Sequence, residues 1–127
     1  HRDVKPENIL YNHVNGQLKL IDFEIAKMAK YDHERIKMFT PTGTLVYKAP
    51  EMFEGEYNEA IDIWSVGVIA YEMAFGQLPF WSQYTHKLVK KIQEEDPKFN
   101  ETLATPLFIR FMKDLLCKNP LERPNVT

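Results

Sequence analysis

The chain has 127 residues, of which 44% are hydrophobic and 13% are aromatic. This composition excludes a disordered chain and is sufficient for one packed domain. The 18 acidic and 16 basic residues give a formal net charge of −2 at pH 7, so no overall positive field would draw the protein to nucleic acid or to an anionic membrane surface. We therefore expect neither nucleic acid nor a membrane as a partner, and recognition of any charged partner has to be local.

Two short β-like runs follow the first eight residues. They cover residues 9–12 and 17–21 and are joined through Asn15-Gly16, a dipeptide that tolerates positive φ and favours a tight turn. The pattern predicts a β-hairpin. Because Asp3 and Asp22 lie just outside its two strands, the hairpin would place these two aspartates side by side.

The rest of the chain divides into one irregular segment and three helical patterns. Residues 23–44 lose apolar periodicity and gather charged side chains, which indicates a long exposed loop. Apolar residues then cover nearly every face of residues 59–75, which predicts a buried helix, and they follow one face of residues 83–95 and 106–117, which predicts two amphipathic helices. The residues expected to face the core in these two helices are Leu88, Val89, Ile92, Phe108, Ile109, Met112, Leu115 and Leu116.

Burial and location can also be predicted from single residues and runs. The one cysteine, Cys117, cannot form an internal disulfide, and we interpret it as a small core residue rather than a nucleophile. Trp64 and Trp81 are expected in the core or just beneath the surface. Residues 63–75 form the longest apolar stretch, but polar residues interrupt it, and no charged-then-apolar leader is present. We expect no membrane span or signal peptide and an intracellular protein, in the cytoplasm with the nucleus as the alternative.

The first residues of the chain carry the chemistry. Lys5 lies two residues after Asp3, Asn8 lies five residues after it, and Asp22 follows the hairpin. Phosphoryl transfer needs a base for the attacking hydroxyl, a cation for the moving phosphoryl group, and carboxylate and amide oxygens for magnesium. These four side chains supply all of them, so the spacing indicates a phosphotransferase.

Five motifs in order extend this pattern along the chain: HRDVKPEN, DFE, GTLVYKAPE, DIWSVGVIAYE and the arginine of LERP. Together they resemble the eukaryotic protein kinase family, and the resemblance covers residues 1–127 from the catalytic loop onward. It implies an α+β, protein-kinase-like fold, of which this chain forms a mainly α-helical C-lobe with a short β-hairpin carrying the catalytic and metal-binding loops. It also implies a partial kinase domain that lacks the N-lobe and the last helix and is inactive by itself.

The resemblance assigns roles to the residues of the catalytic loop. Asp3 would be the catalytic base, and Lys5 would neutralise charge on the transferred phosphoryl group of ATP, in a pattern typical of serine/threonine kinases. Asn8 and Asp22 would bind magnesium and, with Lys5, the nucleotide phosphates. Taken singly, Asp3 could be a solvated loop residue, Lys5 a surface lysine and Asn8 the cap of a turn.

Control by phosphorylation is implied at the loop after the hairpin. Arg2 resembles the arginine that binds a phosphorylated activation-loop residue, because a guanidinium can donate two hydrogen bonds to the oxygens of one phosphate. Thr40 is the stronger candidate for that phosphate and Thr42 the weaker one, each the target of an upstream activating kinase; either could be unmodified. Thr44 is expected to hydrogen-bond the catalytic loop instead.

Three charged residues are expected to support the fold. Asp62 resembles the carboxylate at the start of the buried helix that accepts backbone donors from the catalytic loop, although it could be a plain N-terminal helix charge. Glu51 is expected to form a buried, forked ion pair with Arg123.

Two pairs of residues are expected to touch the protein substrate. Glu7 and Glu72 match positions at which kinases that prefer basic substrates receive an arginine upstream of the phosphoacceptor; Glu72 could equally pair with a local lysine. Leu45 and Val46 would form the apolar pocket for the residue after the phosphoacceptor.

Glu24 departs from the family, which usually has glycine after Asp-Phe. Glycine permits backbone angles that glutamate reaches only at a cost of about 1 kcal/mol or more, so we expect Glu24 to restrict the movement of Asp22 and Phe23. This departure supports an alternative function, a pseudokinase or scaffold lobe that binds partner proteins. The segment from YEMAFGQLPF to IQEEDPKF resembles the calcium/calmodulin-dependent and calcium-dependent kinase group.

Overall fold

The computed structural model describes residues 1–26 and 44–125. Three α-helices and one two-stranded antiparallel sheet form the described part of the chain, as the expected α+β class requires. The strands and helices are β1 (Ile9–Asn12), β2 (Gln17–Leu20), α1 (Ala60–Phe75), α2 (Thr85–Glu94) and α3 (Pro106–Leu115). Four short 3-10 turns accompany them, η1 (Pro6–Asn8), η2 (Thr44–Tyr47), η3 (Pro50–Phe53) and η4 (Pro120–Glu122). The long loop predicted over residues 23–44 lies outside the described residues from 27 to 43.

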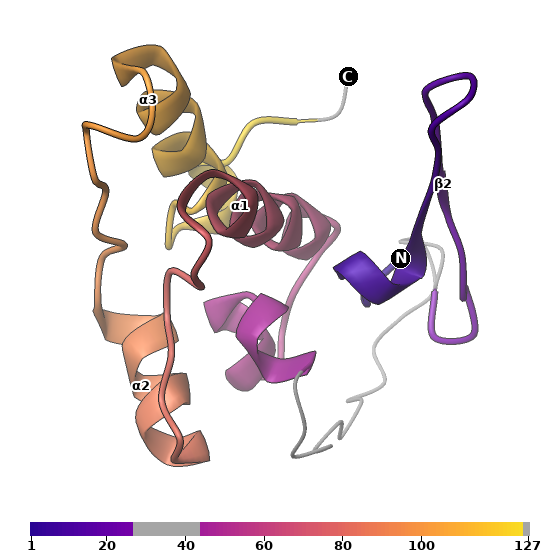
Figure 1. The fold of residues 1–127 in the computed structure, drawn as a ribbon. Helices are drawn as coiled ribbons and strands as arrows, with labels where there is room; N and C mark the ends of the chain where they lie inside the picture. The colour runs from indigo at the N-terminus through magenta and orange to yellow at the C-terminus, as the bar shows by residue number, and fades with distance from the viewer. Residues whose placement is uncertain (27–43, 126–127) are drawn as a thin grey trace.

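The predicted hairpin is present and stands apart from the helices (Figure 1). Its strands pair antiparallel from Ile9 opposite Leu20 to Asn12 opposite Gln17. Gly16 has a φ of 71°, and its N–H donates to the Asn12 carbonyl at 2.8 Å, which closes the turn. The conformational freedom of glycine is used here, because a residue with a Cβ reaches positive φ only at a cost.

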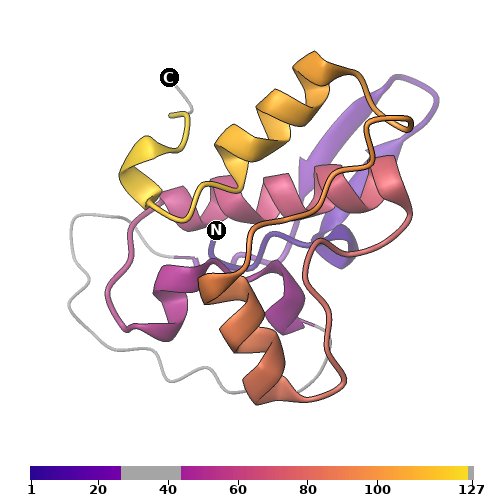
Figure 2. The ribbon, with the colours of Figure 1, turned by 90° about the vertical axis from the view of Figure 1, so that its left-hand side faces the viewer.

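Helix α1 runs through the middle of the helical body, with α3 on one side of it and α2 on the other (Figures 1 and 2). Its buried side chains, among them Ile61, Trp64, Val68 and Tyr71, form the centre of the core. Gly67 allows α3 to approach closely, since a Cβ at this position would lie 2.9 Å from the Cβ of Leu115. The apolar character of the 59–75 pattern therefore predicted the central helix correctly.

The prediction that α1 is buried on all sides was wrong. Val66 is 43% exposed and Met73 82% exposed, and these residues lie seven positions apart, on one face of the helix. The packing partners of α1 among the described elements include α3, η2 and η4, which contact its other sides. Trp81 was also placed wrongly, because its side chain is 62% exposed while the neighbouring Phe80 is buried.

Helices α2 and α3 are amphipathic as predicted. Leu88 and Ile92 of α2 are buried, and α3 turns Ile109, Met112 and Leu115 inward. Helix α3 begins with Pro106 at its first position. The Thr105 side chain caps it by accepting a hydrogen bond from the Phe108 N–H at 3.3 Å. Phe108 itself lies at the surface, contrary to expectation, and stacks on Phe111. No helix in the described part of the chain has the length and apolarity needed to cross a membrane.

Candidate active site

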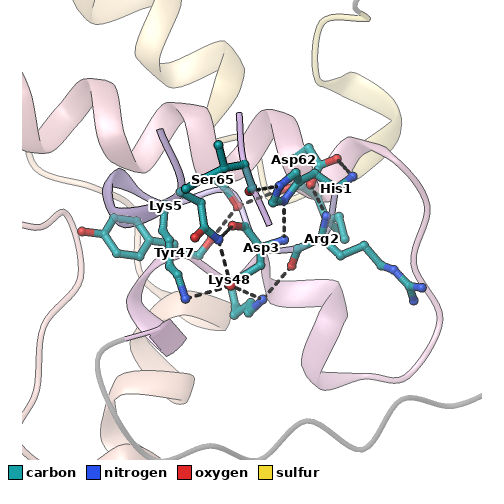
Figure 3. A network of polar contacts seen from close by, with 11 residues as sticks. His1, Arg2, Asp3, Lys5, Tyr47, Lys48, Asp62 and Ser65 are labelled. Atoms are coloured by element: carbon teal, nitrogen blue, oxygen red, sulfur yellow. Dashed lines mark hydrogen bonds and ion pairs between the residues drawn. The ribbon is translucent and has the colours of Figure 1, made fainter. Parts of the chain in front are cut away.

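Asp3 lies at the centre of a network of polar contacts between the first residues of the chain and the segment after η2 (Figure 3). Its Oδ2 lies 2.8 Å from Lys5 Nζ and accepts the side-chain amide of Asn8 at 3.2 Å. Its Oδ1 lies 3.4 Å from Lys48 Nζ. The same Asn8 amide donates to the Asp3 main-chain carbonyl at 2.8 Å. Asp3, Lys5 and Asn8 are thus brought together, as the spacing predicted.

The surroundings of Asp3 keep it ionised. Desolvation by burial raises the pKa of the carboxyl group, but the hydrogen bond from Lys5 and the positive charges of Lys48 and Lys5 outweigh that effect, so the pKa lies below its ordinary value of 3.8. A carboxylate at neutral pH is the form that accepts a proton. The geometry therefore suits Asp3 to act as a base.

Lys48 is a member of the network that sequence reasoning missed. Its Nζ donates to the Arg2 carbonyl at 2.7 Å as well as approaching Asp3, and the residue is buried. Burial lowers the pKa of Lys48, and the charge of Asp3 opposes this only in part. A signal was available, because a lysine within the apolar run LVYKAP cannot be buried without a partner.

Asp62 holds the loop that carries Asp3 in place. Asp62, in the first turn of α1, accepts the main-chain nitrogens of His1 at 2.7 Å and of Arg2 at 2.8 Å, the kind of contact the sequence suggested. Arg2 has a φ of 71°, a left-handed conformation that is unfavourable for a residue with a side chain. The Asp62 carboxylate stabilises this conformation, because it binds the backbone at that residue.

The far end of the hairpin returns to the same loop. The Ile21 N–H donates to the Asn8 carbonyl at 2.9 Å, the Ile21 carbonyl lies 2.9 Å from His1 Nε2, and the Phe23 and His1 rings meet edge to face at 4.6 Å. Asp22, between Ile21 and Phe23, is therefore held next to the loop that carries Asp3.

The side chains of Asn8 and Asp22 carry amide and carboxylate oxygens, the kind of ligand that magnesium prefers. The Asn8 amide nitrogen is committed to Asp3, which leaves its amide oxygen for another partner. Within the described residues, the exposed Asp22 carboxylate accepts one long contact, from the Glu24 N–H at 3.5 Å. Magnesium takes one or two protein oxygens and completes its shell with water and phosphate oxygens. Across the residues that the structure describes, no group of three or more His, Cys, Asp or Glu side chains could hold a metal.

The backbone strain expected at Glu24 is absent. Among the described residues other than glycine, positive φ occurs at Arg2 and at Asp22, where it is 64°. Glu24 is not one of them, and the left-handed residue in this segment is Asp22, two positions earlier. A glutamate in place of glycine therefore carries no cost from left-handed backbone at this position.

A second site contains the two carboxylates expected to bind a basic substrate. The hydroxyl of Tyr47 donates to Glu72 Oε2 at 2.9 Å. Burial raises the pKa of Tyr47, and the hydrogen bond to Glu72 and the charges of Glu72 and Glu7 raise it further, so both carboxylates lie near this hydroxyl. Tyr47, which had been given no role from the sequence, contacts Glu72 and follows the pocket residue Val46 in the chain.

Glu51 and Arg123 form the forked ion pair that the sequence suggested. Arg123 Nη1 and Nη2 lie 2.5 and 2.8 Å from the two Glu51 carboxylate oxygens, and both residues are buried. Arg123 also donates to the carbonyls of Cys117 at 2.8 Å and Ala60 at 3.0 Å. The pair joins η3 to the segment after α3 and takes no part in the polar network around Asp3.

The remaining predicted residues fall partly beyond what the structure describes. Thr40 and Thr42 lie outside the described residues, and so does the side chain of Thr44. The Arg2 guanidinium donates from Nη1 to the Tyr57 hydroxyl at 3.3 Å. The proposed role of Arg2 toward a phosphate stays a prediction.

Comparison with known proteins agrees with these features. The family model described as "Protein kinase domain" matches residues 1–127. CDPK-related kinase 8 of Arabidopsis thaliana is 38% identical over 97% of this chain and 21% of its own length. CDPK-related kinase 5 and serine/threonine-protein kinase TIO, from the same plant, are 37% and 36% identical over 97% of this chain and over 21% and 9% of their own lengths.

The chain thus spans about a fifth or less of the curated relatives it matches. The match nevertheless covers every described element, from the loop of Asp3 to the Arg123 ion pair. The resemblance drawn from the ordered motifs is confirmed: this chain belongs to the protein kinase domain family.

Proposed function

We propose that this chain supplies the catalytic loop of a protein serine/threonine kinase, which transfers the terminal phosphate of ATP to a protein hydroxyl. The observation that carries the proposal is the Asp3 carboxylate, kept ionised within 2.8 Å of Lys5 and 3.2 Å of the Asn8 amide. A base, a cation and a magnesium-ligand side chain at one point are the parts that phosphoryl transfer requires.

The transfer follows from these positions. The substrate hydroxyl donates a hydrogen bond to Asp3, which aligns its oxygen with the terminal phosphorus of ATP. A bond forms between that oxygen and phosphorus, the bond from phosphorus to the bridging oxygen of ADP breaks, and the hydroxyl proton passes to Asp3. Lys5, beside Asp3, provides positive charge for the phosphoryl oxygens.

ATP and magnesium are the cofactors we propose. Asn8 and Asp22 would hold the magnesium ion, which would neutralise the nucleotide phosphates. Asp22 is suited to this role, because its exposed carboxylate has few competing partners among the described residues.

The protein substrate would carry basic residues before the phosphoacceptor. Glu7 and Glu72 supply two negative charges near Tyr47. The Tyr47 hydroxyl donates to Oε2 of Glu72, and among the described residues the other carboxylate oxygen is left for a guanidinium. A forked arginine contact to such carboxylates is strong and directional.

We further propose an upstream activating kinase for Thr40, or for Thr42, with Arg2 receiving the phosphate. We propose the cytoplasm as its location, with the nucleus as the alternative.

Membership of the calcium-dependent group is supported by two relatives whose names are CDPK-related kinases. Nucleic acid and membranes are not proposed as partners, given the net charge of −2.

The rival function is a scaffold lobe that binds partner proteins without transferring phosphate. Its support from the sequence was Glu24, and the ordinary backbone at that residue removes the strain argument. What remains is the negative charge of Glu24 two residues from Asp22.

The test uses the full-length protein, labelled ATP, magnesium and a basic serine peptide. We expect transfer by the unmodified protein and by Lys98→Gln, an exposed control, and loss of transfer in Asp3→Asn. Absence of transfer from folded, activator-treated protein would favour the scaffold.

A further inference from the structure

Two lysines contact the proposed base, Asp3, and they come from different parts of the chain. Lys5 Nζ lies 2.8 Å from Oδ2 of Asp3, and Lys48 Nζ lies 3.4 Å from Oδ1. Figure 3 shows the two ammonium groups on either side of the carboxylate. Lys5 belongs to the same loop as Asp3. Lys48 directly follows η2, the turn that contains the expected substrate contacts Leu45 and Val46, and so joins the base to that turn.

Lys48 is a buried cation that shares its negative partner. Its side chain is 9% exposed, and among the described residues its ion-pair partner is Asp3, which Lys5 also contacts. Asp62 attracts Lys48 without forming an ion pair, and its oxygens accept the main-chain nitrogens of the first two residues. Burial lowers the pKa of Lys48, Asp3 opposes this effect, and repulsion by Lys5 adds to it. A second anion at this point would offset the remaining cost of burying the charge.

One N–H group of Lys48 is left for a further acceptor. An ammonium group has three donors. In the part of the chain that the structure describes, the Lys48 ammonium donates to the Arg2 carbonyl at 2.7 Å and to the Asp3 carboxylate at 3.4 Å. These two contacts fix the nitrogen next to the base and leave the third donor uncommitted.

The third donor is within reach of a phosphoryl group in transfer. The substrate hydroxyl would lie about 2.6–3.2 Å from the Asp3 carboxylate and about 3–3.5 Å from the phosphorus. An ammonium group donates to a phosphate oxygen at about 2.7–2.9 Å. Since Lys48 Nζ is 3.4 Å from the same carboxylate, these lengths allow a direct contact between Nζ and a phosphoryl oxygen.

We propose that Lys48 is a further catalytic residue, whose ammonium group donates a hydrogen bond to an oxygen of the transferred phosphoryl group. The bond from the hydroxyl oxygen to phosphorus forms, the bond to ADP breaks, the hydroxyl proton passes to Asp3, and Lys48 keeps its own proton. The negative charge stays on the phosphoryl oxygens and ends on the phosphate of the product, and a cation fixed beside it stabilises it throughout. The inference rests on the proposed kinase function and adds a second lysine to its site.

The first test measures binding of the phosphate without catalysis. Two labelled peptides of one basic sequence, with serine or phosphoserine, are titrated into the full-length protein by fluorescence anisotropy, without nucleotide or magnesium. We expect Lys48→Met to weaken binding of the phosphoserine peptide at least about tenfold, as for loss of a hydrogen bond between charged groups, and to leave the affinity for the serine peptide nearly unchanged. Equal loss for both peptides, or no loss, would overturn the proposal, because a purely structural lysine affects both alike.

Further variants separate the charge of Lys48 from its support of the loop. Lys48→Gln removes the charge but keeps a donor for the Arg2 carbonyl, and it should show the same selective loss. Lys48→Arg keeps the charge and should retain most of the preference for phosphoserine. Lys98→Met removes an exposed lysine outside the network and should leave both affinities unchanged. Full preference for phosphoserine in Lys48→Gln would contradict a contact through charge.

A phosphate on Thr40 or Thr42 is the other source of an anion for Lys48. The peptide comparison is therefore repeated with both threonines replaced by alanine. The selective loss in Lys48→Met should persist in this background. Its disappearance would assign Lys48 to the phosphate of the chain itself and overturn its role toward the substrate.

Phosphate transfer by the full-length protein gives the second readout. Lys48→Met should lower kcat by about 10², as for loss of one donor to a developing oxyanion, with little change in KM for ATP, and Lys48→Arg should recover part of the loss. A normal kcat in Lys48→Met would refute the catalytic role and leave the kinase function intact. Absence of transfer from the unmodified protein, with selective loss of phosphoserine binding in Lys48→Met, would refute the kinase function and keep the phosphate contact.

Discussion

The two aspartates of the site, Asp3 and Asp22, have opposite surroundings. Asp3 is partly buried, and Lys5, Lys48 and Asn8 contact its carboxylate. Asp22 is exposed, with a single 3.5 Å contact among the described residues. A catalytic base works best when it is already in position before the substrate binds. The contacts around Asp3 suit that role. A metal ligand keeps its oxygens available for the ion that it will bind.

The largest expected effect is on catalysis. Asp3→Asn should lower kcat by about 10²–10⁴, the range for loss of a general base, at every magnesium concentration. Asp22→Asn should also lower transfer, but higher magnesium should restore part of it, because the defect is in metal affinity. A magnesium titration of kcat in both variants measures this. Equal rescue of both would mean that the two aspartates do not differ in role.

The next largest effect is on the stability of the loop that carries Asp3. Asp62→Asn weakens the acceptor of the His1 and Arg2 main-chain nitrogens and should destabilise the protein by about 1–3 kcal/mol. Asp22→Asn, as the matched control, should change the free energy of unfolding by less than about 0.5 kcal/mol. Urea denaturation gives both values. A larger loss of stability in Asp22→Asn than in Asp62→Asn would contradict the account, in which the surrounding chain fixes the Asp3 loop and leaves the Asp22 side chain exposed.

A pH effect follows from Lys48. Its charge helps to hold the pKa of Asp3 below 3.8, so Lys48→Met should raise that pKa. Transfer requires ionised Asp3 and falls as pH falls through its pKa, so the acidic limb of the kcat profile should move to higher pH in the variant. Lys98→Met, which removes an exposed lysine, should leave the limb in place. An acidic limb that stays at the same pH in Lys48→Met would show that this lysine does not act on Asp3.

The smallest effect is expected at Glu24. Its backbone is not left-handed, so Glu24→Gly relieves no strain and adds freedom to the unfolded chain. Stability should fall slightly, by less than about 1 kcal/mol. Thermal unfolding would show this. A gain of more than about 1 kcal/mol would indicate that Glu24 is strained after all.

Much of this arrangement was predictable because local patterns determine it. Asn15-Gly16 predicted the hairpin, and helical periodicity predicted α2 and α3. The family motifs named Asp3, Asn8 and Asp22, and the Glu51–Arg123 contact is also present. Each of these rests either on a short segment or on a motif with a fixed order along the chain.

The contacts that escaped prediction join residues far apart in sequence. Lys48 and Asp3 are 45 residues apart, and Tyr47 and Glu72 are 25 apart, so no local pattern reports either pair. Composition also misled, because apolar residues lie on nearly every face of α1 while two of them, Val66 and Met73, are exposed. An apolar residue indicates that burial is favourable, but only packing determines which face is covered.

The most direct test of the contrast between Asp3 and Asp22 is calorimetric titration of magnesium-ATP into the full-length protein and its two aspartate variants. We predict that Asp3→Asn binds magnesium-ATP with nearly unchanged affinity although it does not transfer phosphate, and that Asp22→Asn binds it at least about tenfold more weakly, as for loss of a metal ligand. Normal binding by Asp22→Asn, together with loss of binding by Asp3→Asn, would contradict the account.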